Sequence, residues 1–599
     1  MFLRRRHKIV EGERYEYWSL VETVRTSRGP RHRTVAQLGK LLPEEIVTAE
    51  GWDSLDDVLS GRAKSCPRQG SLFESREEKV NEGRALWKTI DVSRVRVERV
   101  REFGRSYVGL LLWRRLGLDK ILKDLVPGGK ESVGWDTTAC VLTLGRFSAV
   151  LSELSIAEKW YNDTALEDLL GIPVESLNSN RLYRGLDHFL PHKDALSNHL
   201  IRKYEDWFGV DFEFLLYDVT STYFEGTGKR NDQAKRGYSR DSRPDCPQVC
   251  IGLVVSPEGL PLAYEVFDGN RADVTTLNDI VTLMESKYGK AKRVWVFDRG
   301  ITSEENLKNL RERGGKYIVG TPKSHLKRHE AALLEEENWE LIRDGLEVKL
   351  VESPHRSERF ILCRSTDRAE KERAMLEQQM TRLKAELERI NQGLKKRPSI
   401  NTEKIERRIG RWLGRYTAAE KLITVTLIKN ADGAAVGLEI IEHTEKKDSV
   451  SRAYGAYLLR TNYSEGTAQE LWKWYIQLSQ AESAFRAAKS DLHLRPVFHQ
   501  KTERVNAHIL VCFLSLALWR TLEMWMKSKG LGTCARQFLQ ECERLQMMDV
   551  ILPTDSGIEL RIRVVATPDS HLQILLQRLG IKLPKTPKLI TQMVKPCNL

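Results

Sequence analysis

The stretch that decides the fold is FLLYDVTSTYFE, residues 214–225. Four apolar residues, Phe214 to Tyr217, run directly into Asp218, and Thr220, Ser221 and Thr222 follow. A continuous apolar run of this length is typical of a strand buried on both faces. A carboxylate at the end of such a strand costs free energy unless it is paired or binds a metal. Asp218 is therefore either a turn residue or a functional acid.

The same pattern recurs downstream in RVWVFDRG, residues 293–300, where Val294 to Phe297 lead into Asp298. Two buried strands that each deliver an aspartate could bring both carboxylates to one point. A third acid on a suitable helix further along the chain would favour a functional role over a pair of strand-end turns.

Length, charge and cysteine spacing limit the class of protein that this sequence can encode. The chain has 599 residues, enough for several domains around at least one large core. It carries 96 Lys and Arg against 83 Asp and Glu, a formal charge of +13, which permits a polyanionic partner. The nine cysteines are irregularly spaced, and Cys246 and Cys250 lack a second pair of zinc ligands. With no signal peptide and no apolar stretch longer than Ile509–Trp519, we expect a cytoplasmic protein.

Residues 1–100 and 101–210 give the least information about function. Residues 1–100 form a small β-containing region, with strands expected at Tyr15–Val24 and Arg33–Leu38 around a Ser-Arg-Gly-Pro turn. The basic run Arg4–Lys8 is either a frayed tail or a DNA-contacting arm. Residues 101–210 are mainly helical and form a possible DNA-binding domain. Asn178 is expected to cap a helix that begins with polar and basic residues, which could enter a major groove, although a surface helix is the favoured interpretation.

Residues 211–325 alternate between strands and helices in the order β-β-β-α-β-α-β. Three successive strands indicate an antiparallel meander, and the alternation after it indicates a parallel extension. This order matches the ribonuclease-H-like fold, a mixed α/β architecture in which the first and fourth strands are neighbours, so that Asp218 would lie beside Asp298. The loop after the first strand is basic and includes Arg240 and Arg243. The expected strands are 214–217, 249–255, 263–267, 293–297 and 317–320, and the expected helices are 275–288 and 304–311.

Residues 326–465 are expected to form an insertion domain that interrupts the sheet. A heptad seam and a Pro398 break predict a helical hairpin at 370–416, flanked by strands near 359–363, 436–441 and 456–459. From Asp367 to Arg415 there are 14 Lys and Arg against 8 Asp and Glu. Two helices packed on each other is the favoured interpretation, and a basic arm along DNA or a dimer contact is the alternative. The seam residues are Leu376, Met380, Leu383, Leu387, Ile390 and Leu394.

The closing segment, residues 466–525, is the second part of the core. Ala468–Leu492 lacks Gly and Pro and predicts one long helix. At about 100° per residue, Tyr475, Glu482, Arg486 and Lys489 share one face of it. This face is either a salt-bridged surface, with Glu482 and Arg486 paired at i,i+4, or a third metal ligand beside phosphate-binding cations. Residues 526–599 are expected to be a C-terminal region of short helices and turns.

These acids suit phosphodiester chemistry. Cleavage and strand transfer can be run by two metal ions about 4 Å apart, and Mg²⁺ prefers hard oxygen ligands. The blocks DVTSTYFEG, GNRADVTTL, FDRGI and ESAFRAAKSDLHLRPVFH resemble those of bacterial insertion-sequence transposases of the DDE type, in the group with a Tyr-Arg-Glu-Lys signature. Tyr475, Glu482 and Lys489 fit the signature spacing, while Leu478 stands where Arg is expected. The resemblance covers roughly residues 212–520.

The resemblance implies the site residues. Asp218, Asp298 and Glu482 would be the catalytic ligands of two Mg²⁺ ions, with Mn²⁺ as a substitute, and Tyr475 and Lys489 would contact DNA phosphates. Arg486, one turn past Glu482, could supply the charge missing at Leu478, which is an inference from this sequence rather than from the family. Arg240 and Arg243 are further candidate DNA contacts.

The resemblance to DDE transposases also implies an activity. A transposase of this type would bind terminal inverted repeats, cleave the transposon ends and join them to target DNA. We expect a homodimer in the DNA complex, and a protein associated with the bacterial nucleoid when bound. A structure-selective nuclease on the same fold and a catalytically inactive, transposase-derived DNA-binding protein remain open as alternatives.

Overall fold

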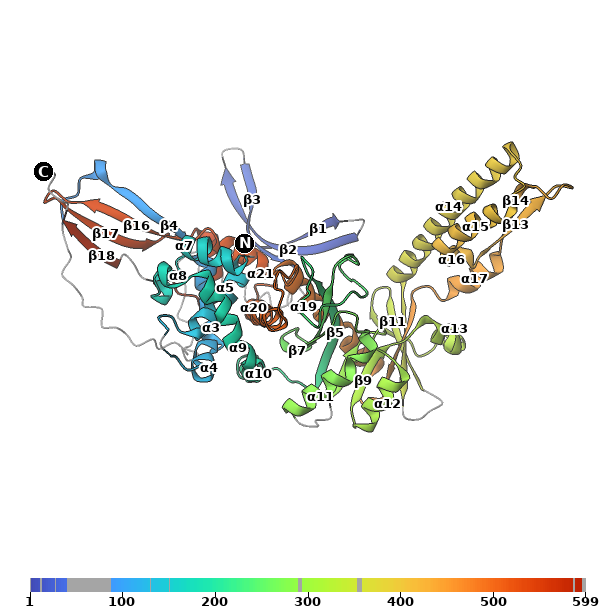
Figure 1. Ribbon diagram of the computed structural model, residues 1–599, viewed down its shortest axis with the longest axis horizontal. Helices are drawn as coiled ribbons and strands as arrows, with labels where there is room; N and C mark the ends of the chain where they lie inside the picture. The colour runs from blue at the N-terminus through green and yellow to red at the C-terminus, as the bar shows by residue number, and fades with distance from the viewer. Residues whose placement is uncertain are drawn as a thin grey trace. The chain divides into compact units, whose positions relative to one another are not determined.

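The computed structural model describes residues 2–10, 13–26, 29–39, 88–129, 131–149, 151–288, 293–352, 358–584 and 588–594. The chain divides into two compact units, whose segments can be found by residue number on the colour bar of Figure 1. Unit 1 contains residues 1–211, 219–271 and 480–599, and unit 2 contains residues 212–218 and 272–479. The division falls inside strand β5 (Phe214–Tyr223), so this strand contributes to both units.

Unit 2 is built on seven strands of a mixed sheet, in the order β10-β11-β12-β15-β9-β8-β5. Strands β5, β8 and β9 are parallel neighbours, and the strands from β15 to β10 pair antiparallel. The apolar run of β8 is buried throughout, as a strand covered on both faces requires. The additional strands and helices are β8 (Val294–Phe297), β9 (Lys316–Gly320), β10 (Glu340–Arg343), β11 (Leu346–Glu352), β12 (Arg359–Ser365), β15 (Ala456–Thr461), α11 (Leu277–Tyr288), α12 (Glu304–Glu312), η6 (Lys323–His329) and α13 (Glu330–Leu334).

The predicted pairing of the first and fourth strands is confirmed. β5 runs parallel to β8 in a register that matches Phe214 with Val294 and Tyr217 with Phe297. One detail differs, because β5 does not stop at Tyr217 but continues through Asp218 to Tyr223. Thr220, Ser221 and Thr222, which follow Asp218, are buried strand residues, so Asp218 is not the strand-end turn residue that the sequence left open.

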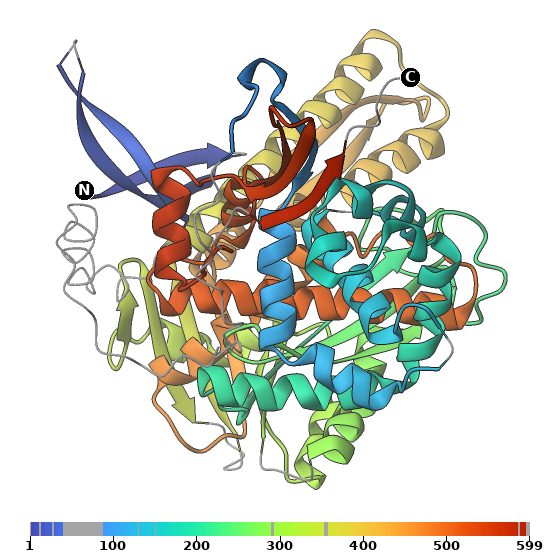
Figure 2. The same ribbon diagram turned by 90° about the vertical axis from the view of Figure 1, so that its left-hand side faces the viewer.

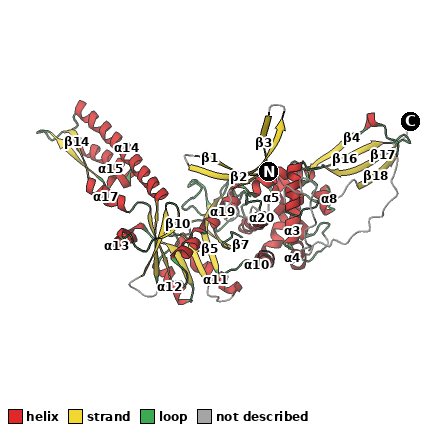
Figure 3. Cartoon of the chain, turned by 180° about the vertical axis from the view of Figure 1, so that it is seen from behind, coloured by secondary structure: helices red, strands yellow, loops and turns green. Residues whose placement is uncertain are grey.

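The helical hairpin of unit 2 is also confirmed. The heptad seam of α14 (Thr366–Lys396) is buried. Asn401 caps α15 (Thr402–Arg415), and its side chain accepts a hydrogen bond from the Lys404 amide at 3.0 Å. The seam packs on α15 and on a two-stranded β-hairpin, of which the sequence predicted only the strand near 436–441. Together these elements form a hydrophobic core (Figure 3). The other elements of this lobe are α16 (Thr417–Glu420), β13 (Ile423–Lys429), β14 (Ala435–Glu442) and α17 (Thr444–Arg452).

Unit 1 is organised around α20 (Thr502–Ser528). By length and composition α20 could cross a membrane, but 89% of its most apolar 18-residue window is buried inside the fold, as in the core helix of a globular protein. It contacts β7 from the second half of the meander and the helices α3, α5, α9 and α10 from the N-terminal region (Figure 2). The elements around it are β6 (Gln248–Val255), β7 (Pro261–Asp268), α3 (Gly104–Arg115), α4 (Leu118–Leu125), α5 (Trp135–Ser148), α6 (Glu153–Ser155), α8 (Leu166–Leu170), α9 (Ser179–Phe189) and α10 (Lys193–Phe208).

Helix α9 is the helix that could have entered a major groove. Asn178 caps it as predicted, accepting a hydrogen bond from the Arg181 amide at 3.0 Å. The Arg181 guanidinium donates to the Val133 carbonyl at 2.6 Å and lies over the Trp135 ring, so it stabilises the helical region from within. The apolar face of α9 is buried.

Two further sheets belong to the chain termini. β1 (Phe2–Val10), β2 (Glu13–Thr26) and β3 (Gly29–Gly39) form an antiparallel sheet, so the basic run Arg4–Lys8 is a strand and not a frayed tail. The rest of the predicted small N-terminal region, from residue 40 to residue 87, lies outside the described residues.

The C-terminal region is not made of short helices and turns alone. α21 (Ala535–Cys542) and α22 (Ser570–Arg578) are present, but β16 (Gln546–Pro553), β17 (Ile558–Val565) and β18 (Lys588–Val594) form a sheet with β4 (Arg96–Glu102). In β17, apolar residues alternate with Glu559, Arg561 and Arg563, which is the period of a half-buried strand. The charged residues obscured that pattern in the sequence.

The single long helix predicted over Ala468–Leu492 is two helices. α18 (Ala468–Ile476) and α19 (Leu478–Ser490) are separated at Gln477, whose amide bonds to the Tyr475 carbonyl in a tightened last turn. Leu471 of α18 is buried in unit 2, and Ala484 and Phe485 of α19 are buried in unit 1. The two helices therefore pack on different cores, and this packing breaks the helix without a Pro or a Gly.

Candidate active site

Asp218 and Asp298 come from adjacent parallel strands of unit 2. Each follows directly after one member of the last paired couple, Tyr217 and Phe297. Asp218 is half-buried and Asp298 is exposed. Two carboxylates on neighbouring strands, at the same level of the sheet, offer the hard oxygen donors that Mg²⁺ and Mn²⁺ prefer.

Tyr475, on α18, is bound to one of these acids. Its hydroxyl donates to Asp298 Oδ1 at 3.4 Å. Burial, and then the negative charge of Asp298, raise the pKa of Tyr475, so the hydroxyl keeps its proton and acts as a donor. The side chain that was predicted to contact DNA phosphate therefore also orients the second acid.

The close fit of Tyr475 depends on Gly320, the last residue of β9. A Cβ added at Gly320 would lie 2.6 Å from the Tyr475 hydroxyl oxygen. We expect Gly320→Ala to displace Tyr475 and to lower the stability of unit 2 by about 1–3 kcal/mol, the usual cost of overpacking. Thermal unfolding of the variant would measure this loss, with Gly393→Ala on α14 as the control, because a Cβ there meets nothing within 4 Å. Equal midpoints for the two variants would contradict the tight contact.

A cationic pocket of about 410 Å³ opens beside Asp298, entirely within unit 2. Two of its cations share one acid, because Lys323 and Arg368 lie 2.6 and 3.2 Å from Glu372 Oε1. Among the described residues, Arg299 has no ion-pair partner. Cations in excess over acids favour a phosphate-containing ligand. The charged and aromatic residues of the lining are Asp298, Arg299, Lys323, Arg343, Arg368, Tyr457, Trp472 and Tyr475.

The remaining members of the predicted face lie on α19 in unit 1. Glu482 and Arg486 are exposed, and no ion pair joins these two residues where the structure describes them, so the salt-bridged interpretation fails. Leu478, at the position where the signature has Arg, is buried with 7% of its surface exposed and cannot act as a cation. The meeting of Glu482 with the two aspartates stays a prediction.

Lys489 is engaged with a residue that the sequence did not single out. Its ammonium donates to Asp241 Oδ1 at 2.8 Å, and Arg495 donates to the same oxygen. The Asp241 side chain is 1% exposed and that of Lys489 is 11% exposed. Lys489 is thus a buried, paired cation in unit 1.

The two loop arginines differ in their surroundings. The backbone amide of Arg240 donates to Ser221 Oγ at 3.3 Å, which fastens the loop to β5. The guanidinium of Arg243 pairs with Asp245 at 3.0 Å and lies 4.9 Å from the centre of the Tyr223 ring. A DNA contact by either side chain stays a prediction.

Comparison with known proteins decides the family. Residues 211–518, slightly more than half of the chain, match the family model described as "Transposase DDE domain". The chain belongs to the DDE transposases. Residues 3–77 match the model described as "IS1634 family transposase, N-terminal domain", which identifies a bacterial insertion-sequence transposase.

Other comparisons add little to this assignment. A search of curated proteins gave no match for the transposase. Among solved structures it is similar to a piggyBac transposase synaptic complex with hairpin DNA, at 8% identity over 73% of this chain and 79% of that chain, with a TM-score of 0.35. A likeness at that level carries no argument about the site.

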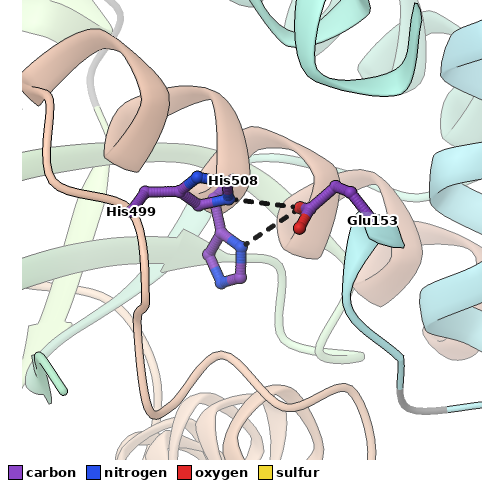
Figure 4. Close-up of side chains that lie close together, drawn as sticks. All are labelled: Glu153, His499 and His508. Carbon is purple, nitrogen blue, oxygen red and sulfur yellow. Dashed lines mark hydrogen bonds and ion pairs between the residues drawn. The ribbon is translucent and has the colours of Figure 1, made fainter. Parts of the chain in front are cut away.

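A separate cluster in unit 1 of the transposase has metal-ligand chemistry. His499 Nε2 and His508 Nδ1 lie 3.2 and 4.0 Å from Glu153 Oε1, and both rings face that carboxylate (Figure 4). However, the Arg146 guanidinium lies 2.9 Å from His508 Nδ1 and 3.8 Å from Glu153. The Arg146 guanidinium occupies the position of a metal ion in this cluster and supplies the positive charge that the ion would bring. The cluster therefore fits a buried ion-pair network better than a metal site.

Proposed function

We propose that this transposase binds the inverted repeats at its transposon ends, cleaves the DNA there and joins the ends to target DNA. The observation that carries the proposal is the parallel register of β5 and β8, which sets Asp218 and Asp298 at one level of the sheet. The strand order, with the first and fourth strands as neighbours, supports a ribonuclease-H-like catalytic core. Glu482 on α19 is the proposed third acid.

The donor set fits divalent ions. Three carboxylates are hard oxygen ligands, and we propose that they hold two Mg²⁺ ions, for which Mn²⁺ can substitute. When bound, such a pair activates the attacking oxygen and stabilises the leaving oxygen of an in-line displacement. No covalent nucleophile of the protein is required.

The side chains around the acids have distinct tasks in this proposal. Tyr475 orients Asp298 through its hydroxyl. Arg299, Lys323 and Arg368 in the adjacent pocket hold DNA phosphates near the cut. Arg486, exposed on the same helix as Glu482, binds a further phosphate. Arg240 and Arg243 extend this surface along the loop after β5.

The partners follow from the activity. The proposed ligands are the terminal repeats and target DNA, bound by a homodimer that brings two ends together. A DNA-acting transposase of this kind is expected in the bacterial cytoplasm, on the nucleoid when bound.

The test uses DNA from the borders of the coding frame. Purified protein, labelled end fragments and a supercoiled plasmid are incubated with Mg²⁺, and cleaved and joined products are separated on a gel. We expect cleavage at the ends and joining to the plasmid, both lost with a chelator and both lost in Glu482→Ala. Cleavage without joining would indicate a nuclease, and binding without cleavage would indicate an inactive descendant.

A further inference from the structure

Helix α15, in the hairpin lobe of unit 2, carries four cations in a single row on its surface. They are Lys404, Arg408, Arg411 and Arg415, at steps of four, three and four residues. At about 100° per residue, these steps place all four side chains within about 60° of one another around the helix. Each of the four residues is exposed. We call this set the α15 stripe.

The stripe is not neutralised by acids of the protein. Where the structure describes the chain, none of its four side chains forms an ion pair. The two acids of α15 are engaged with other cations: Glu403 pairs with Arg407 at 3.1 Å. Glu406 lies 4.0 Å from Lys429 of β13. Like charges three and four residues apart destabilise a helix, so the stability of α15 does not explain the stripe, and an anionic ligand outside the chain does.

The packing of α15 fixes the direction in which the stripe points. Ile409 is buried in the core of the lobe, and Ile405 and Trp412 pack against the same core. The helix therefore cannot turn about its axis without exposing these apolar side chains. The Arg415 guanidinium lies 5.4 Å from the centre of the Trp412 ring, which holds this cation in place and leaves its charge intact.

Two glycines on the exposed side of α15 are a second, independent observation. A Cβ added at Gly410 or at Gly414 would meet nothing within 4 Å, so no contact within the protein requires glycine there. A glycine inside a helix makes the helix less stable than an alanine would. Gly414 lies one helical turn from Arg411. Since glycine also allows a ligand to approach the backbone closely, these two positions leave room for a ligand beside the stripe.

We propose that the α15 stripe binds the phosphate backbone of duplex DNA, with Gly410 and Gly414 letting the strand lie close to the helix. The inference rests on DNA as the ligand of the proposed function and adds a contact surface outside the pocket beside Asp298. From Lys404 to Arg415 the stripe extends about 16 Å along the helix. A DNA strand carries one phosphate about every 3.4 Å along its axis, so the stripe can follow about five phosphates. Phosphate contacts carry no base sequence, so transposon-end DNA and target DNA both offer this ligand.

The salt dependence of DNA binding by the purified full-length protein tests the stripe. Each phosphate contact contributes about 0.9 to the slope of log K against log salt concentration. We expect Arg408→Gln/Arg411→Gln to reduce the slope by about 1.8. The thermal midpoint should stay at the wild-type value, because both side chains are exposed.

Arg382→Gln/Lys396→Gln is the matched control for this variant. Both of its residues are exposed on α14, away from the buried seam, and the change in net charge is the same. The control should keep the wild-type slope. An equal reduction in both variants would mean that only net charge matters and would overturn the proposal, as would a wild-type slope in Arg408→Gln/Arg411→Gln.

Two DNA fragments of equal length, one with the terminal repeat and one without it, distinguish the sources of the phosphates. We expect the stripe variant to lose slope on both fragments. A loss on the repeat fragment alone would support the proposal for the transposon end, and a loss on the other fragment alone would support it for target DNA. No loss on either fragment would overturn it.

The glycines test whether the DNA strand lies close to the helix. Gly410→Ala/Gly414→Ala should raise the thermal midpoint, because alanine favours a helix and each Cβ has room. The same variant should weaken DNA binding several-fold, since the two methyl groups would separate the strand from α15. A raised midpoint with wild-type affinity would overturn the close approach.

None of these measurements requires cleavage. A protein whose stripe variant loses slope, but which cuts no ends, would contradict the proposed function and support the stripe. A protein that cuts and joins ends, and whose stripe variant keeps the wild-type slope, would overturn the stripe alone.

Discussion

Replacing Asp298 by Asn should lower DNA cleavage by about 10³-fold or more while end binding changes little. The substitution keeps the size of the side chain and removes the negative charge that a divalent ion needs. Metal ions stabilise the charge of such a transition state by several kcal/mol, and each 1.36 kcal/mol is a factor of ten in rate. The measurement is single-turnover cleavage of labelled end DNA in Mg²⁺, with binding followed by gel shift.

Asp432→Asn is the matched control, because Asp432 is an exposed acid in the turn between β13 and β14. It should cleave like the wild type, and Asp218→Asn should fail like Asp298→Asn. Cleavage by Asp298→Asn at the wild-type rate would remove this acid from the site and would leave the paired strands without a catalytic role.

The pairing of β5 with β8 could be predicted because its signals are local. The parallel strands β5 and β8 each contain a continuous apolar run, and the places of Asp218 and Asp298 directly after these runs can be read from the sequence. The order of strands and helices then restricts the topology to few possibilities, which is why the neighbouring positions of these two strands could be predicted. The heptad seam of α14 was predictable for the same reason, since its period is visible without a partner.

Pairings and breaks that depend on distant partners were not predictable. β4 pairs with β16 across most of the length of the chain, and β12 and β15 join the large sheet from within the predicted insertion. The break at Gln477 follows from the two cores on which α18 and α19 pack, and no residue at the break marks it. In each case the deciding energy is tertiary burial, which a local pattern does not contain.

The candidate site shows the same division. Asp218 and Asp298 were predicted from their places after apolar runs, and Tyr475 and Glu482 from a shared helix face, but Asp241 lies 248 residues from Lys489 in an otherwise ordinary basic loop. Arg299 could have been noticed, since it follows Asp298 directly. His499 and Glu153 are 346 positions apart, so no local pattern around either residue predicts their contact.

Glu153→Gln should destabilise the packing of α20 by about 3–5 kcal/mol, the usual cost of removing one partner of a buried ion pair. Glu153 and Arg146 are each 8% exposed in their side chains, and the change would leave the Arg146 charge uncompensated. The measurement is native-state hydrogen exchange of the α20 amides, which reports the local free energy of opening. Glu158→Gln, an exposed acid close by in the sequence, should leave that protection unchanged. Equal protection in both variants would show that the network contributes nothing to α20.

The same network should make α20 sensitive to acid. Burial, and then the charge of Arg146, lower the pKa of His508 from 6.5 to about 4. In the pH range between these values the unfolded chain binds a proton at this residue and the folded chain does not, so stability falls as pH falls. At 1.36 kcal/mol per pKa unit, lowering the pH from 7 to 5 should cost about 2 kcal/mol at this site.

The pKa of Glu153 is also lowered, because hydrogen bonding to His499 and His508 outweighs the effect of burial. The stability that depends on the Glu153 charge is therefore lost only at lower pH. The measurement is hydrogen exchange of the α20 amides at pH 7 and pH 5, corrected for intrinsic rates. The pH effect should be smaller in His508→Gln than in the wild type. An equal effect would mean that His508 is not kept neutral by its surroundings.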